Sequence, residues 1–288
     1  MDLIKNLKLF SVGEQVAAAK NQLVFLGYLT KATNNRFGTD TLKAVKTFQA
    51  ANGLQVDGII GPMTWAALFA RGQENPVESC YDQIPLWITA SKRRVIADEL
   101  DKVSFTRRKI CLNALQLATD PDLHGALCCF YIRGGNAYNQ DLSLNVMTEG
   151  KLRSYFGKTS YAPYYDNGRK GMMEAQAKAS NYSIAGADCS GLIVGLWRKE
   201  KVKSAGFDAN ANSLYSSFCV PTTNPIPGDL AWRSGHIGLY VGGFIVEAIG
   251  GEYGVQVTKA NNRKAWSYTR KKLVSLSKWT AYGDPKCY

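Results

Sequence analysis

Histidine is almost absent from this sequence of 288 residues, which contains only His124 and His236. Its seven cysteines include no C-x-x-C pair, so ligands at the spacings typical of a zinc site are missing. We therefore expect no metal and no organic cofactor. Because seven is an odd number, intramolecular disulfides cannot pair every thiol, and a nucleophilic cysteine becomes a hypothesis to test.

Long apolar runs are also missing, and no segment reaches the ~18 residues needed to cross a bilayer. Met1–Phe10 alternates charged and apolar residues, unlike a secretory signal. We expect a chain made in the cytoplasm without a signal peptide and without membrane insertion, which leaves the cell by another route if at all. The net charge of +12 favours polyanions. Charge alone leaves nucleic acid, anionic wall polymers and lipid head groups as candidates. No basic run flanks a nucleic-acid motif, so we expect no nucleic-acid partner and keep anionic wall polymers as a further partner.

The pattern along the chain predicts two domains and an α+β fold. Residues 10–71 form a small domain of three helices, in which Thr41–Ala51 is amphipathic and Gly61-Pro62 opens the last helix. Residues 72–90 combine Gly, Pro and charge without periodicity, which is typical of a linker. In residues 91–288 a long helix or helix pair comes first, and strand patterns dominate after residue 227. Residues 140–187 have no assignable pattern.

Two alternating apolar runs around Gly242-Gly243 predict a β-hairpin that contains His236. With the two glycines as turn residues, Leu239 faces Val246, and that face of the hairpin is wholly apolar. Glu247 is then the diagonal neighbour of His236 on the opposite face. An acceptor that orients a histidine base is the general arrangement of a catalytic triad.

Cys189 is the cysteine most suited to chemistry. It stands just before the apolar run Leu192–Trp197, and a cysteine in the first turn of a helix is expected to favour the thiolate. Its backbone N–H would be free to stabilise an oxyanion. The other sites have plainer interpretations: Cys111, Cys128 and Cys129 as core, His124 as a solvated residue, and the basic cluster 263–272 as a solvated face or, alternatively, as an attraction for wall polymers.

The N-terminal segment resembles the peptidoglycan-binding domain of bacterial and phage wall hydrolases. The matching residues, in the expected order, are Val16, Gln22-Leu23, Leu26-Gly27-Tyr28-Leu29, Phe37-Gly38, Thr41, Ala44-Val45, Phe48-Gln49, Gly53-Leu54, Asp57-Gly58, Gly61, Thr64 and Leu68. The resemblance implies peptidoglycan as the ligand.

The second domain resembles the NlpC family of papain-like cell-wall cysteine peptidases, in the segments Asp188–Leu192, Pro227–Leu230, Gly235–Tyr240 and Tyr131–Gly135. This resemblance implies helices packed on a mainly antiparallel sheet. It also implies Cys189 as nucleophile, His236 as base, a third residue that orients the histidine, and Tyr131 near the oxyanion. The chain departs from the family in two ways: Glu247 stands where histidine is usual, and nearly 50 residues separate the tyrosine segment from Cys189.

We therefore expect a monomeric peptidoglycan hydrolase that cuts the stem peptide between D-glutamate and the diamino acid through Cys189, His236 and Glu247. The missing signal suits a phage endolysin that reaches the wall after release. An N-acetylmuramoyl-L-alanine amidase with the same machinery is the alternative. A non-catalytic wall-binding structural protein is the alternative from another class.

Overall fold

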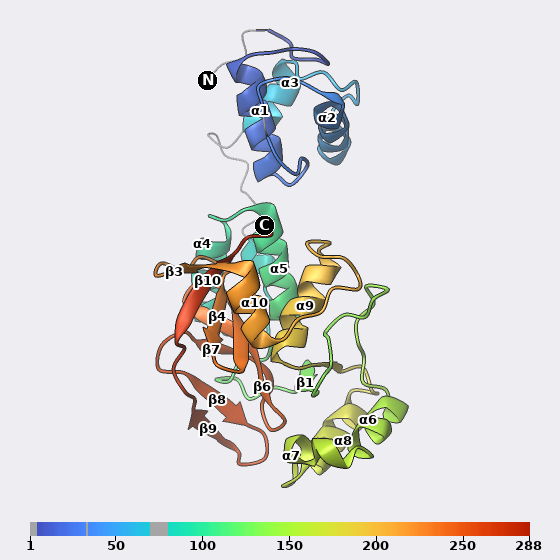
Figure 1. The fold of residues 1–288 in the computed structure, drawn as a ribbon, viewed down its shortest axis with the longest axis vertical. Coiled ribbons are helices and arrows are strands. Elements are labelled where there is room, and N and C mark those ends of the chain that lie inside the picture. Colours follow the sequence, from blue (N-terminus) through green and yellow to red (C-terminus); the bar gives the residue numbers. More distant parts are fainter. Residues whose placement is uncertain (1–4, 33, 70–79) are drawn as a thin grey trace. The chain divides into compact units, whose positions relative to one another are not determined.

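A computed structural model describes residues 5–32, 34–69 and 80–288. The chain divides into two compact units, Met1–Val77 and Glu78–Tyr288 (Figure 1). Residues 72–79, the first part of the predicted linker, lie outside the described residues. Each unit is considered by itself below.

The N-terminal unit contains the three expected helices, α1 (Glu14–Phe25), α2 (Thr39–Ala51) and α3 (Pro62–Phe69). Its core joins side chains of α1, α2 and α3 to Leu7, Phe37 and Ile60. Gln49 is buried, and its amide nitrogen donates to Asp57 Oδ1 at 2.8 Å and to Thr64 Oγ1 at 3.1 Å. One buried amide thus ties α2 to the Asp57-Gly58 turn and to α3.

The second unit is α+β, as the sequence predicts. Its helices are η1 (Cys80–Gln83), α4 (Ala90–Leu100), α5 (Phe105–Gln116), α6 (Glu149–Phe156), η2 (Thr159–Tyr161), α7 (Ala162–Tyr165), α8 (Arg169–Ala179), α9 (Cys189–Lys199) and α10 (Ala211–Phe218). Its strands are β1 (Cys129–Tyr131), β2 (Ala185–Ala187), β3 (Cys219–Thr222), β4 (Leu230–Arg233), β5 (His236–Tyr240), β6 (Phe244–Gly250), β7 (Gly254–Lys259), β8 (Lys264–Ser267), β9 (Lys272–Ser275) and β10 (Ala281–Pro285).

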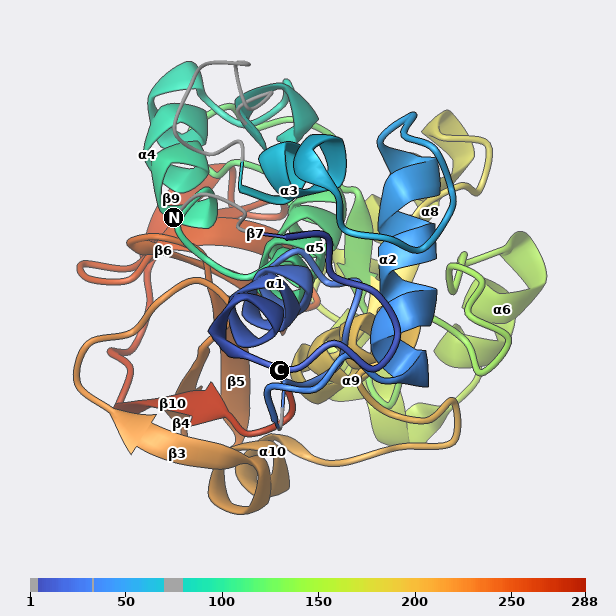
Figure 2. The same cartoon turned by 90° about the horizontal axis from the view of Figure 1, so that it is seen from above.

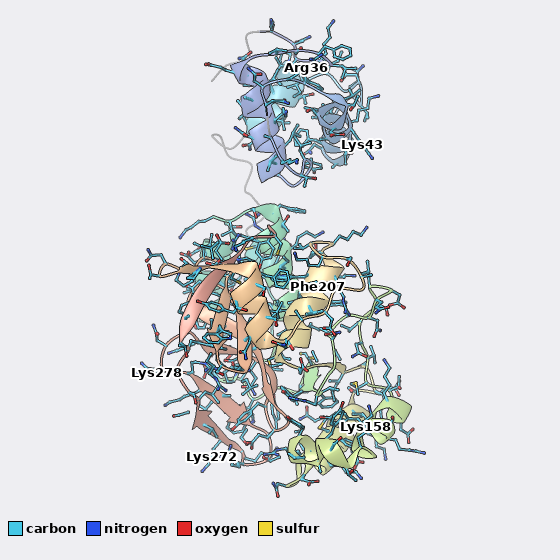
Figure 3. The ribbon with its side chains drawn as sticks, in the orientation of Figure 1. Arg36, Lys43, Lys158, Phe207, Lys272 and Lys278 are labelled. Atoms are coloured by element: carbon cyan, nitrogen blue, oxygen red, sulfur yellow. The ribbon has the colours of Figure 1, made fainter. Side chains whose placement is uncertain are left out.

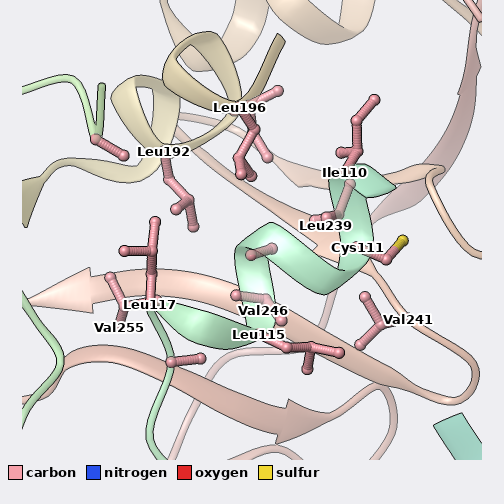
Figure 4. Close-up of a cluster of buried hydrophobic side chains, with 14 of the residues drawn as sticks. Ile110, Cys111, Leu115, Leu117, Leu192, Leu196, Leu239, Val241, Val246 and Val255 are labelled. Atoms are coloured by element: carbon pink, nitrogen blue, oxygen red, sulfur yellow. The ribbon is translucent and has the colours of Figure 1, made fainter. Parts of the chain in front are cut away.

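Six of these strands form one antiparallel sheet in the order β3-β10-β4-β5-β6-β7, and helices α5 and α9 pack on it (Figures 1 and 2). The main core lies between them. Leu192 and Leu196 of α9 and Leu115 of α5 meet Leu239 and Val246 of the sheet (Figure 4). Residues 80–90 of the predicted linker do not all behave as a linker, because Cys80, Ile84 and Ile88 are buried in this core.

The unassigned segment 140–187 contains α6, α7 and α8, which lie together at one end of the unit in Figure 1. They have their own apolar cluster, which includes Leu152, Tyr165 and Met173. The short strand β1 lies between the two cores. Cys129 and Tyr131 face the main core, whereas Phe130 belongs to the second cluster. This alternation follows from the two-residue period of a strand.

Candidate active site

Cys189 is the first residue of α9, directly after strand β2. Asp188 caps the helix: its side chain accepts hydrogen bonds from the N–H of Gly191 at 2.8 Å and from that of Gly134 at 2.8 Å. The thiol is nearly buried, and Cys189 Sγ lies 4.0 Å from the carbonyl oxygen of Gly235. The nucleophile proposed from sequence is therefore held against the turn that precedes His236.

The position of Cys189 in the first turn agrees with the sequence prediction, but the expected preference for thiolate is not found. Burial raises the pKa of the thiol to about 11, and the charge of Asp188 raises it further, against backbone N–H groups that include that of Ile237. The helix end is outweighed because desolvation disfavours the charged form. The thiol is therefore neutral near pH 7.

His236 begins strand β5 and is buried. The hairpin has the predicted register, with Leu239 opposite Val246, and both Gly242 and Gly243 have the positive φ that the turn requires. His236 Nε2 lies 2.7 Å from Glu247 Oε2, the diagonal contact expected from the sequence. Because Nε2 is engaged, the other ring nitrogen is the one left to serve the thiol.

Glu247 is fully buried, with 0 % of its surface exposed. Besides His236, its carboxylate accepts hydrogen bonds from the hydroxyl of Thr258 and from the guanidinium of Arg263. Burial raises the pKa of this carboxyl, but the contacts with His236 and Arg263 outweigh that effect and lower it below the usual range. Glu247 is thus an ionised acceptor between two cationic or potentially cationic groups.

Arg263 and Trp279 complete the cluster, and sequence reasoning missed both. The prediction of a solvated basic face is wrong for Arg263, which is only 3 % exposed, although Lys264, Lys271 and Lys272 are exposed. The guanidinium carbon of Arg263 lies 3.9 Å from the ring centroid of Trp279. That ring stacks on His236 at 5.2 Å and 6°. A predicted buried glutamate could have signalled the need for a buried cation.

Asn212 at the start of α10 is a second residue that the sequence analysis missed. Its side-chain oxygen accepts from the backbone N–H of Gly235 at 2.9 Å and from the indole of Trp232 at 3.1 Å. Gly235 lies in the turn between β4 and β5, Trp232 lies in β4, and the carbonyl of Gly235 contacts Cys189. Asn212 therefore helps to fix the segment that separates the thiol from the imidazole.

Tyr131 lies near the thiol despite the long intervening segment. Strands β1 and β2 are parallel, Tyr131 is the register partner of Ala187, and Cys189 follows two residues later. Burial raises the pKa of the Tyr131 hydroxyl, and the neighbouring Cys189 and Asp188 raise it further. The Tyr131 ring stacks on Tyr164 of α7 at 5.8 Å. The hydroxyl is therefore a neutral donor at physiological pH.

A polar hollow of about 290 Å³ is lined by both sequence neighbours of Cys189 but not by Cys189 itself. Its lining residues are Gly134, Asn136, Asp188, Ser190, Asp208, Ala209 and Asn210. By contrast, His124 is exposed and stacks on Trp266 at 3.6 Å, as a solvated residue. All seven cysteines are free thiols. Within residues 5–32, 34–69 and 80–288, no group of three or more His, Cys, Asp or Glu could hold a metal, and no helix is long and apolar enough to cross a membrane.

Comparison with known proteins identifies the class of the N-terminal unit. Residues 12–68 match the family described as "Putative peptidoglycan binding domain". The match lies within the N-terminal unit and supports peptidoglycan as a binding partner.

Two individual proteins are also similar. An uncharacterized protein in the bpoA1 3' region of Kitasatospora aureofaciens is 44% identical over 57 residues, which cover 19% of this chain and 48% of that protein. The chain thus spans about half the length of that curated relative. A phage endolysin of Burkholderia AP3, known from its crystal structure, is 20% identical over 63% of this chain and 69% of its own. The TM-score of 0.22 is too low to show a shared fold.

Proposed function

We propose that this chain is a peptidoglycan hydrolase in which Cys189 attacks a stem-peptide carbonyl. The observation that carries the proposal is the arrangement of the second unit: a thiol at a helix N-terminus, against the turn that bears a histidine whose far nitrogen contacts a buried carboxylate. Nucleophile, base and orienting acceptor are the three parts of a thiol acyl-transfer site. The wall-binding unit supplies the substrate class.

The reaction follows from these positions. His236 takes the proton from Cys189 as the sulfur–carbon bond forms, and the carbonyl oxygen becomes an oxyanion. The backbone N–H of Cys189 has no intrahelical partner at this position, so it is free to donate to that oxygen, and the Tyr131 hydroxyl is a second donor. The carbon–nitrogen bond then breaks, and His236 returns the proton to the leaving amine.

The thioester is hydrolysed by the same base. His236 removes a proton from water as the oxygen attacks, the carbon–sulfur bond breaks, and the proton returns to the sulfur. The bond that we propose is the one between D-glutamate and the diamino acid. Delivery to the wall after release from a phage-infected cell is part of the same proposal.

The test is mass spectrometry of purified peptidoglycan digested by the full chain. New amino groups on the diamino acid identify the endopeptidase, whereas free amino groups on L-alanine identify the alternative amidase. Cys189→Ala and His236→Ala should each remove hydrolysis and leave sedimentation with walls unchanged. Cys219→Ala is the matched control, because Cys219 is also a buried thiol but donates only to the carbonyl of Leu214, at 3.5 Å.

Wild-type hydrolysis by Cys189→Ala would reject the thiol mechanism. Wall binding with no release of fragments by the unaltered chain would instead favour the non-catalytic alternative. The two outcomes are separated by the same digest, since binding and product release are measured on one sample.

A further inference from the structure

We propose that Arg263 is a positioning residue that makes Glu247 a charge-neutral partner for His236 and thereby keeps the imidazole an unprotonated base. The catalytic meaning of this proposal rests on the proposed function. The charge relationship itself does not, and it can be measured in a protein that does no chemistry.

The geometry places two groups on one carboxylate oxygen. Oε2 of Glu247 contacts both His236 Nε2, at 2.7 Å, and the Nη2 of Arg263. Arg263 and Glu247 are both almost completely inaccessible to solvent, so their charges are weakly screened. The other guanidinium nitrogen, Nη1, donates to the carbonyl of Ser277. Arg263 is therefore fixed and cannot swing away from Glu247 without breaking a second contact.

Trp279 joins these groups on a third side. Its ring stacks on the His236 ring and also lies beside the Arg263 guanidinium. Gly238 leaves space for this packing: a Cβ there would lie 3.1 Å from the Glu247 Cβ and 3.3 Å from the Trp279 ring. The Glu247 carboxylate is fully buried, which strengthens the electrostatic effect of each neighbour.

The sign of the effect follows from counting charges. A buried carboxylate alone stabilises imidazolium and raises the pKa of a neighbouring histidine. Arg263 cancels that carboxylate, so protonation of His236 would leave the buried group of three with one net positive charge. The pair Glu247–Arg263 therefore presents the formal charge of a neutral residue to His236.

The other side chains beside Glu247 and His236 are neutral or, in the case of Arg233, partly exposed. Around Glu247, Thr258 is a neutral donor, and Gln256, its register partner on β7, uses its amide on the backbone of Tyr253 and Trp266. Beside His236 lie the neutral thiol of Cys189 and the cation Arg233, which is the register partner of His236 on β4. Arg233 is partly exposed, so solvent screens its charge more than it screens the charge of buried Arg263. Tyr282, which shares the neighbourhood of Arg263, is a phenol with a raised pKa and is neutral.

The experiment is an NMR titration of the two histidines in the Cys189→Ala full chain. His124 is exposed on Trp266 and serves as the internal reference. Arg263→Met should raise the pKa of His236 by about one unit or more, because an uncancelled carboxylate then faces the ring. Glu247→Gln should lower it by a similar amount. The double variant Glu247→Gln/Arg263→Met should return it to within about 0.5 units of the parent.

Arg263→Lys is the control that separates loss of charge from a disturbed structure. It alters the side chain but retains its positive charge, so the pKa of His236 should stay close to the parent value. A His236 pKa in folded Arg263→Met within about 0.3 units of the parent would overturn the proposal, as would a double variant that titrates like Glu247→Gln alone. With Cys189 present, the acidic limb of kcat/KM should move with the NMR value. If the unaltered chain releases no fragments, the titration still decides the charge relationship while the proposed function fails.

Discussion

Tyr131 and Ala187 are register partners in the parallel pair β1–β2, so the chain returns after the inserted helices to one strand spacing from where it left. Cys189 follows Ala187 by two residues. The insertion therefore separates the tyrosine from the cysteine in sequence and leaves them neighbours in space.

Tyr131→Phe tests whether the hydroxyl takes part in hydrolysis. The substitution keeps the ring and its stack on Tyr164, so stability should change by less than about 0.5 kcal/mol. If the hydroxyl donates to the oxyanion, kcat should fall by roughly tenfold to a hundredfold, somewhat less than for a backbone donor. Tyr138→Phe is the matched control, because Tyr138 has the same 8 % exposure. Equal rates for the two variants would assign Tyr131 to packing alone.

Gly191→Ala tests the close contact that seats the thiol-bearing helix. A Cβ at Gly191 would lie 1.9 Å from the carbonyl oxygen of Gly135, so α9 must shift from the loop after β1. We expect a loss of about 1–3 kcal/mol in urea unfolding, together with a loss of hydrolysis. Gly171→Ala in α8 is the control, since a Cβ there meets nothing within 4 Å and should stabilise the helix by about 0.5–1 kcal/mol. A stable, fully active Gly191→Ala would contradict the contact.

The lowered pKa of Glu252 predicts how the stability of the fold depends on pH. Burial raises the pKa of its carboxyl, but hydrogen bonds from Arg270, Ser267 and Thr269 outweigh this and lower it to about 2, from an ordinary 4.5. Between these values the unfolded chain binds the proton and the folded chain does not, so this contribution is present above pH 4.5 and is lost as the pH falls toward 2. The difference in Tm between wild type and Glu252→Gln should shrink over that range. A constant difference would show that Glu252 is not coupled to folding, and hydrolysis near neutral pH should be unchanged.

The N-terminal unit should bind walls by itself, because its apolar core contains only its own residues. A hollow of about 470 Å³ on this unit is lined by Lys20, Lys31, Arg36 and the start of α2, and Arg36, labelled in Figure 3, is exposed. Residues 1–77 should sediment with purified walls. Lys31→Gln should weaken this binding, whereas Lys43→Gln, an exposed lysine outside the hollow, should not. If both variants lose wall binding equally at moderate salt, the binding reflects general charge attraction instead.

Local sequence patterns were sufficient to predict the hairpin that contains His236, but not the side chains that pack around it. Strict alternation about Gly242-Gly243 sets both the register and the face of each side chain, so the contact between His236 and Glu247 could be predicted. Arg263 and Trp279 come from segments between strands, where no periodicity indicates which side chain is buried. Their positions depend on long-range pairing, which a single sequence does not reveal.

The same limit explains the two regions that the sequence analysis misplaced or left open. Ile84 and Ile88 lie in a short segment around Pro85 with no helical or strand periodicity, and only the folded core shows that they are buried. Helix α7 has four residues, too few for a helical period to be recognised.

The ends of the inserted helical segment are joined by a hydrogen bond from Met147 N–H to the carbonyl of Ile184, at 2.8 Å. Because its two ends lie side by side, this segment could be replaced by another without moving the strands that flank it. A different module between these two residues, with side chains that still cover Phe130, would change the protein surface near the Cys189 thiol. Strands β1 and β2 would still hold Tyr131 close to Cys189. Variation at this junction is thus a route by which the frame formed by β1, β2 and α9 can acquire new neighbours.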